Sequence, residues 1–134
     1  MEKELLFEGK ENTTSVNVKE FSPKGAVLDI SLRGKISGKV DGFILSTHNI
    51  VMKPDRTSEV EIKSMTFSNG EAVFVSGKDT GKVVDPTPIG KIEGNLTFQT
   101  PSQRLAYLNT TNSWTEATYN IATGEYNFKV YAIK

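Results

Sequence analysis

Polar and apolar residues alternate along most of this chain, and the alternation breaks at Gly, Pro, Asn and Asp. The clearest stretch covers residues 26–44, where the even positions are apolar or glycine and the odd positions from 29 to 41 are charged or serine. A period of two is typical of a strand with one buried face and one solvated face. The pattern therefore predicts an all-β protein.

Glycines recur on the apolar side of this stretch, and residues 88–96 repeat the Gly-Lys-Ile-x-Gly pattern of residues 32–40. A turn at Arg33-Gly34 would place an apolar and a charged residue on the same face, so we expect one strand over 26–44 that bends at its glycines. Inward glycines permit the strong coiling that a closed barrel requires. We predict a single antiparallel β-barrel domain of about eight strands over residues 1–134, with a β-sandwich as the alternative.

Turn residues predict how the strands connect. Asn69-Gly70 is a strong signal for a two-residue type I′ hairpin turn. A second such turn at Thr123-Gly124 would place Tyr119 opposite Phe128. Further connections are expected at 53–56, between strands 43–52 and 57–67, and at 77–81, which resembles a tight glycine-bounded loop. Residues 101–108 fit either a short helix, the only one expected, or a strand.

The overall composition narrows the choice of partners and compartment. Sixteen Lys and Arg residues balance sixteen Asp and Glu residues, whereas nucleic-acid-binding domains usually carry a basic excess. Because the charges balance, nucleic acid is not an expected partner. No run of about 18 apolar residues is present, so a membrane is not an expected partner either. The chain has no cysteine, and its first residues lack the basic and apolar regions of a secretory signal. We therefore expect a cytoplasmic location.

The glycine-bent strand, the Phe- and Tyr-rich hairpins and the final run 124–131 resemble the allene-oxide-cyclase-type barrels. This is a calycin-like superfamily of short antiparallel barrels, and the resemblance covers residues 26–44 and 87–133. It implies a barrel around an apolar pocket, which such proteins sometimes use for small hydrophobic ligands or their cyclisation. No catalytic residue of the superfamily matches, so none is carried over.

Candidate chemical motifs are weak. His48 is the only histidine, so it cannot form a multi-histidine metal site, and we expect it at a barrel rim or sheet edge. Residues 76–83 resemble a phosphate-binding loop but have one residue too few between the glycines, and Val83 occupies the position of the magnesium-binding Ser or Thr.

The carboxylates give no acid–base pair. Asp79 and Asp85 are expected in loops, and Asp41 and Glu93 on solvated strand faces. We predict no catalytic residue, no metal site and no cofactor.

Inward glycines have two interpretations: they relieve crowding where strands coil, or they leave space for a ligand. In the second case the ligand would contact residues on the apolar faces of the bent strands and of the last hairpin. These candidate ligand-binding residues are Ile36, Gly38, Val40, Gly42, Gly94, Leu96, Phe98, Tyr119 and Phe128.

Two aromatic residues, Trp114 and Tyr131, fall on the outer side of their strands, and with Phe43 and Leu45 they are candidates for a contact between subunits. Three functions remain. The first is a non-enzymatic barrel that binds a small apolar or amphipathic molecule. The second is a structural protein with a solid core that assembles into a homo-oligomer. The third is an isomerase or cyclase, which would require a buried titratable group.

Overall fold

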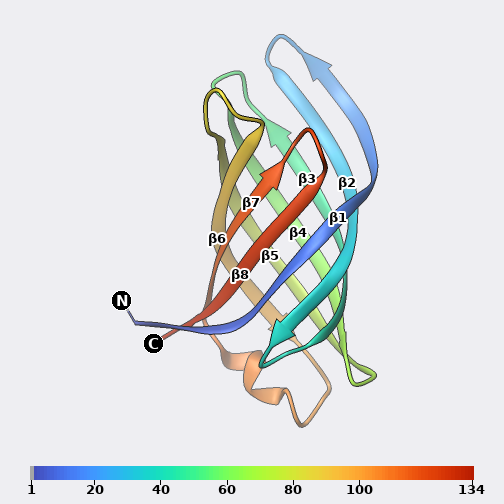
Figure 1. Cartoon of the computed structure of the whole chain (residues 1–134), viewed down its shortest axis with the longest axis vertical. Helices are drawn as coiled ribbons and strands as arrows, with labels where there is room; N and C mark the ends of the chain where they lie inside the picture. Colours follow the sequence, from blue (N-terminus) through green and yellow to red (C-terminus); the bar gives the residue numbers. More distant parts are fainter. Residues whose placement is uncertain (1) are drawn as a thin grey trace.

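The computed structural model describes residues 2–134, which form a closed barrel of eight antiparallel strands and one short 3-10 helix (Figure 1). The strands are β1 (Lys3–Ser22), β2 (Gly25–Gly38), β3 (Gly42–Met52), β4 (Thr57–Ser68), β5 (Glu71–Val83), β6 (Ile89–Gln99), β7 (Ser113–Asn120) and β8 (Glu125–Ile133), and the helix is η1 (Ala106–Thr110). Each strand pairs with the next, and β8 pairs with β1. The predicted antiparallel barrel is confirmed, and the closed sheet excludes the sandwich.

Because every strand runs opposite to its neighbours, the connections alternate between the two ends of the barrel (Figure 1). The turns after β1, β3, β5 and β7 lie at one end, which we call the open end. The turns after β2 and β4, the η1 segment and both termini lie at the other, which we call the closed end. No helix among residues 2–134 is long and apolar enough to cross a membrane.

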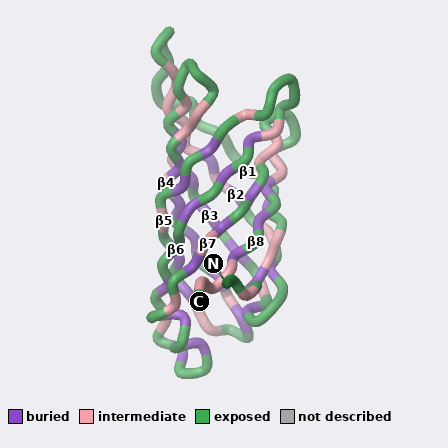
Figure 2. Tube along the Cα trace, turned by 90° about the vertical axis from the view of Figure 1, so that its left-hand side faces the viewer, coloured by how far each residue is buried: buried purple, intermediate pink, exposed green. Residues whose placement is uncertain are grey.

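The predicted alternation of buried and exposed residues runs along the strands, while the tips of the connections are exposed (Figure 2). Even-numbered residues of β2 and β3 and odd-numbered residues of β5 point inward. The core combines aliphatic and aromatic side chains from every strand, including Phe7, Ile30, Ile44, Ile62, Val75, Phe98, Ala117 and Val130.

The expected long strand over 26–44 is wrong in its length, although β2 does run straight through Arg33-Gly34 as predicted. The chain turns between Gly38 (φ 131°) and Gly42 (φ 145°), conformations that favour glycine. A Cβ at Gly38 would lie 2.7 Å from the Leu6 carbonyl oxygen, and one at Gly42 would lie 2.9 Å from the Phe67 carbonyl carbon. These glycines therefore serve a tight turn. The period of two continues across this turn, which is why the pattern did not show it.

The hairpin at Asn69-Gly70 is confirmed, with positive φ at both residues. The other predicted hairpin has a longer loop, residues 121–124, so the register is displaced by two residues and Tyr119 lies opposite Tyr126. The reason lies in Asn120. Its side-chain oxygen accepts the N–H groups of residues 122 and 123, and its backbone carbonyl accepts that of Gly124 at 2.8 Å. A displacement of two residues keeps every side chain on its predicted face.

The segment between β6 and β7 covers the closed end. Leu105 and Leu108 are each 1% exposed and pack against the core. Thr100 and Asn109 exchange two hydrogen bonds of 2.8 and 3.1 Å, and the Ser102 hydroxyl accepts the N–H of Leu105. The segment that the sequence left open between helix and strand is thus a loop with one 3-10 turn.

Candidate functional site

A cluster of polar side chains lies inside the barrel, among the apolar core residues. Six strands contribute to it, and every member is less than 9% exposed: Glu11 (β1), Ser46 and His48 (β3), Ser64 (β4), Asp79 (β5), Thr115 (β7) and Tyr126 (β8). Buried polar groups normally find hydrogen-bond partners, because the loss of hydration is costly. The partners of each group therefore show which members are structural and which are available.

Glu11 is only partly satisfied. It lies opposite Tyr126 in the β1–β8 ladder. Its Oε1 accepts a hydrogen bond of 3.0 Å from Ser46 Oγ, which lies 2.7 Å from Ser64 Oγ, while Oε2 has no partner. Burial raises the pKa of Glu11 to about 7, and the Ser46 hydrogen bond partly opposes this increase.

Asp79 has no hydrogen-bond partner at either carboxylate oxygen, and the residue is 2% exposed. It points inward from β5, between Val60 of β4 and Gly94 of β6. Burial raises its pKa to about 7. The sequence predicted a loop here, and that prediction is wrong because residues 77–81 are part of β5.

His48 and Tyr126 pack edge to face, with ring centroids 4.9 Å apart. His48 is 2% exposed and lies in the interior, not at a rim as expected. Burial lowers its pKa to about 4, so the ring is neutral at pH 7. The pKa of Tyr126 lies well above its ordinary value, mainly because the residue is buried and also because the carboxylates of Asp79 and Glu11 are nearby. Both carboxyl groups therefore lie near the Tyr126 side chain.

A small cavity lies at the centre of this cluster. It offers about 20 Å³ to the centre of a water molecule, and its lining includes Glu11, His48, Ser64, Thr115 and Tyr126. A space of this size holds about one water. Among residues 2–134, no group of three or more His, Asp or Glu side chains is arranged to hold a metal ion.

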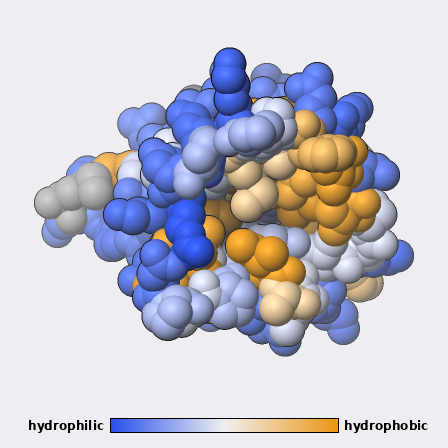
Figure 3. All heavy atoms as spheres, turned by 90° about the horizontal axis from the view of Figure 1, so that it is seen from above, coloured by the Kyte–Doolittle hydropathy of each residue, from blue (hydrophilic) through white to orange (hydrophobic). Residues whose placement is uncertain are grey.

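A second, larger cavity occupies the open end and is referred to as the mouth. It offers about 140 Å³ and is walled by apolar side chains, among them Leu28, Ile30, Ile50, Val60, Ile92 and Tyr119, with Arg56 and Ser58 among its polar residues. Figure 3, which looks onto this end, shows apolar residues gathered around a hollow. An apolar cavity of about 150 Å³ is large enough to hold benzene.

The mouth lies directly above Asp79. Val60 lines the mouth and is the register partner of Asp79. Gly81 also lines the mouth and is the next inward residue after Asp79 on β5. A third, Ile92, precedes Gly94 on the inner face of β6. Gly81 has no side chain, and the space beside it holds the Ser58 hydroxyl group and Ile92, which would lie 2.6 and 3.3 Å from a Cβ there.

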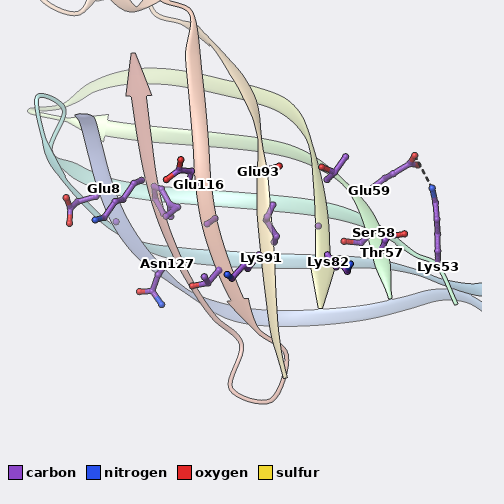
Figure 4. Close-up of a pocket in the computed structure, with 18 residues that line it drawn as sticks. Glu8, Lys53, Thr57, Ser58, Glu59, Lys82, Lys91, Glu93, Glu116 and Asn127 are labelled. Atoms are coloured by element: carbon purple, nitrogen blue, oxygen red, sulfur yellow. Dashed lines mark hydrogen bonds and ion pairs between the residues drawn. The ribbon is translucent and has the colours of Figure 1, made fainter. Parts of the chain in front are cut away.

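The outer surface carries a broad, shallow concavity of about 1030 Å³ over β4–β8 and β1 (Figure 4). Its charged side chains are of both signs: Glu8, Glu59, Glu93 and Glu116, and Lys53, Lys82, Lys91 and Lys129. Lys53 and Glu59 are within 3.4 Å of each other. None of these groups is buried, so this surface has the character of an ordinary solvated face.

The nine candidate ligand-binding residues do not form one site. Leu96 and Phe128 line the central cavity, and Tyr119 lines the mouth. Ile36, Val40 and Phe98 are buried in the core, and Gly38 and Gly42 flank the turn at the closed end. The space beside Gly94 holds the Asp79 side chain. Their role in ligand binding stays a prediction.

Neither buried carboxyl group was predicted from the sequence, although a signal for each exists. Glu11 follows Phe7 and Gly9 at a spacing of two, and Asp79 follows Val73 and Val75 at the same spacing. Each is thus a charged residue on the apolar parity of its strand. Gly77 and Gly81 obscured the second signal because glycines at that spacing are also typical of a loop.

Trp114 and Tyr131 are register partners on the outer face of β7 and β8, and both are half-buried. Lys3 Nζ lies 4.5 Å from the Tyr131 ring centroid. Phe43 and Leu45 are 61% and 44% exposed on β3. A contact between subunits through these residues stays a prediction that light scattering at micromolar concentration tests.

No known family model matches the chain, and no curated protein matches its sequence. Solved structures do match its fold. A Clostridium acetobutylicum protein of unknown function superposes with a TM-score of 0.88 at 18% identity, covering 100% of both chains. A β-barrel-like protein from Acinetobacter baumannii gives 0.85 at 18% identity, with 99% of this chain and 96% of that one covered. A protein described as an enzyme from Penicillium herquei gives 0.73 at 18%, with 99% and 94% covered. At these identities the similarity shows the barrel fold alone.

Proposed function

We propose that this barrel binds one small, largely apolar molecule in its mouth. The observation that carries the proposal is the cavity itself: about 140 Å³ with predominantly apolar walls, in a barrel whose other end is covered by Leu105 and Leu108. Ligand sites in proteins are typically concave and apolar with a few polar groups. The resemblance to the allene-oxide-cyclase-type barrels agrees with an apolar pocket.

The size of the mouth limits both the ligand and its affinity. A single aromatic ring buries roughly 150 Å², which at about 25 cal/mol per Å² contributes about 4 kcal/mol and corresponds to a Kd of about 1 mM. Toluene is therefore a suitable probe. Its binding can be followed by NMR or calorimetry at millimolar concentrations.

Gly90 provides a sharp test. It is buried and lines the mouth, and a Cβ at this position would meet only the Tyr119 carbonyl oxygen, at 3.8 Å. A Gly90→Leu side chain therefore has room to enter the mouth. The control is Thr118→Leu, which adds a similar apolar side chain to an exposed position on β7. We expect toluene to bind the wild type and the Thr118 variant but not the Gly90 variant. Equal binding by all three proteins would refute the proposal.

Acid–base catalysis as an isomerase or cyclase is a second candidate, favoured by one specific observation. The buried titratable group that such a reaction requires is present, because Glu11 and Asp79 both have a pKa of about 7. A general acid or base is most effective when its pKa lies near the working pH. The enzyme from Penicillium herquei has the same type of fold, which adds an argument by analogy only.

The two candidates differ in what happens to the bound molecule. A carrier returns its ligand unchanged, whereas an isomerase or cyclase converts it. The test is to isolate the molecule that copurifies with the protein from its own host and to incubate it with fresh protein. Conversion that is lost in Asp79→Asn would establish catalysis. Recovery of the unchanged molecule would leave the binding function alone.

A further inference from the structure

We propose that the molecule bound in the mouth carries a hydrogen-bond donor, a hydroxyl or amino group, which it donates to the Asp79 carboxyl group. This inference rests on the proposed binding function and adds the chemical class of the ligand. It assigns to Asp79 the recognition of the ligand's polar end, and to the apolar walls the recognition of its body.

Asp79 lacks a hydrogen-bond partner within the protein. Glu11, the other buried carboxyl group, already accepts a hydrogen bond from Ser46, while both oxygens of Asp79 accept none. A buried acceptor without a partner is costly, so such a group in a native protein calls for an explanation. A donor on the ligand would supply the missing hydrogen bond.

Asp79 also lies close to the floor of the mouth. Its register partner Val60 lines the mouth, as does Gly81, the next inward residue on its own strand. Gly94 accommodates the carboxyl group, and the space beside Gly81 holds the Ser58 hydroxyl group and Ile92, 2.6 and 3.3 Å from where a Cβ would stand. A ring that fills the mouth therefore has its deep end one strand position from Asp79, with the Ser58 hydroxyl group beside it.

Charge near Asp79 also favours a particular class of ligand. Asp79 and Glu11 both lie close enough to Tyr126 to raise the pKa of its hydroxyl group. An anionic ligand would place a further negative group beside two carboxyl groups in a space with little water, which is unfavourable. A hydroxyl or amino group has the opposite character, since it offers a hydrogen to an acceptor.

The test uses three probes of the same size and shape that differ in one substituent: phenol and aniline, which donate hydrogen bonds, and toluene, which does not. Their affinities are measured by NMR titration at pH 8 for the wild type and for Asp79→Leu. The variant replaces an unpartnered buried carboxyl group with a somewhat larger apolar side chain of the same branched shape, so it is expected to fold. Asp79→Asn serves as a second variant that keeps the shape and one acceptor oxygen. Thermal unfolding checks both.

We expect the preference for phenol and aniline over toluene to fall at least tenfold in Asp79→Leu and by a smaller factor in Asp79→Asn, because a hydrogen bond to a charged group accounts for that much affinity. The assignment to Asp79 would be overturned if the preference were equal in all three proteins, which is the result expected if a bound water alone satisfies the carboxyl group. It would also be overturned if the preference were lost in Glu11→Gln instead. Toluene binding in that case would leave the proposed function intact. If none of the three probes binds the wild type, both proposals fail.

Discussion

The Asp79 side chain occupies the space where a side chain of residue 94 would stand. The two residues are register partners in the β5–β6 ladder, and a Cβ at Gly94 would lie 2.7 Å from Asp79 Cγ. The glycine on one strand thus makes room for the carboxyl group on the next. This pair explains why a charged residue can be buried at the centre of an otherwise close-packed barrel.

The first prediction concerns this pair. Gly94→Ala is expected to destabilise the protein by about 1–3 kcal/mol, because the added methyl group collides with Asp79 and with the backbone behind it. The matched control is Gly90→Ala, four residues earlier on the same face of β6, where a methyl group meets nothing closer than 3.8 Å. Urea unfolding measures both. Equal costs at the two positions would show that Asp79 does not fill the space beside Gly94.

A second prediction concerns the pH dependence that Asp79 gives to stability. Its pKa rises from 3.8 to about 7 on folding, so the folded state binds the proton more tightly than the unfolded state. The stabilisation is fully present below pH 4 and is lost as the pH rises through about 7. A shift of about three units corresponds to about 4 kcal/mol.

The measurement is the free energy of unfolding of the wild type and of Asp79→Asn between pH 4 and pH 8. We expect the variant to gain about 4 kcal/mol relative to the wild type across this range. Glu11→Gln is expected to change in the same direction, since burial also raises the pKa of Glu11 to about 7. A difference between wild type and variant that does not vary with pH would contradict the burial of these groups.

The third prediction has the opposite sign. Burial lowers the pKa of His48 from 6.5 to about 4, so the unfolded state takes up its proton first as the pH falls. Stability is lost between about pH 6.5 and 4, by about 3 kcal/mol over the whole window. His48→Gln should remove this loss, which acid titration of both proteins by circular dichroism would reveal. The account fails on this point if the two acid transitions coincide.

The fourth prediction concerns the closed end. Leu108→Ala is expected to cost about 2–5 kcal/mol, because Leu108 is 1% exposed and packs against the core. The neighbouring Tyr107, at 44% exposed, provides the control, and Tyr107→Ala should cost far less. A similar small cost for both variants would mean that η1 does not seal the barrel.

Much of the fold could be predicted from the residue pattern. The period of two gives the inward and outward faces, and Asn69-Gly70 gives its hairpin with the correct register. The pattern failed where a turn preserves the parity, as between Gly38 and Gly42, and where a side chain lengthens a loop, as Asn120 does after β7. Both depend on local backbone geometry that an alternation of polar and apolar residues does not record.

The candidate site was less predictable. Tyr119 was expected beside a ligand and does line the mouth, but the mouth also depends on Leu28, Ile50 and other residues of strands distant in sequence. Their convergence depends on how the closed barrel brings its tilted strands together. Glu11 and Asp79 were visible only as charges on the apolar parity of their strands. Their lack of partners is a property of the folded interior.

The most direct test of the central claim is to locate the bound probe. Methyl-labelled protein is titrated with toluene, and the NMR signals of Ile30, Ile50, Val60 and Ile92, which line the mouth, are compared with that of Val73, a buried residue outside its lining. We predict saturable shifts of the four mouth signals with Val73 unchanged, and no such shifts in Gly90→Leu. Shifts confined to other residues, or none at millimolar toluene, would contradict a binding site at the open end of the barrel.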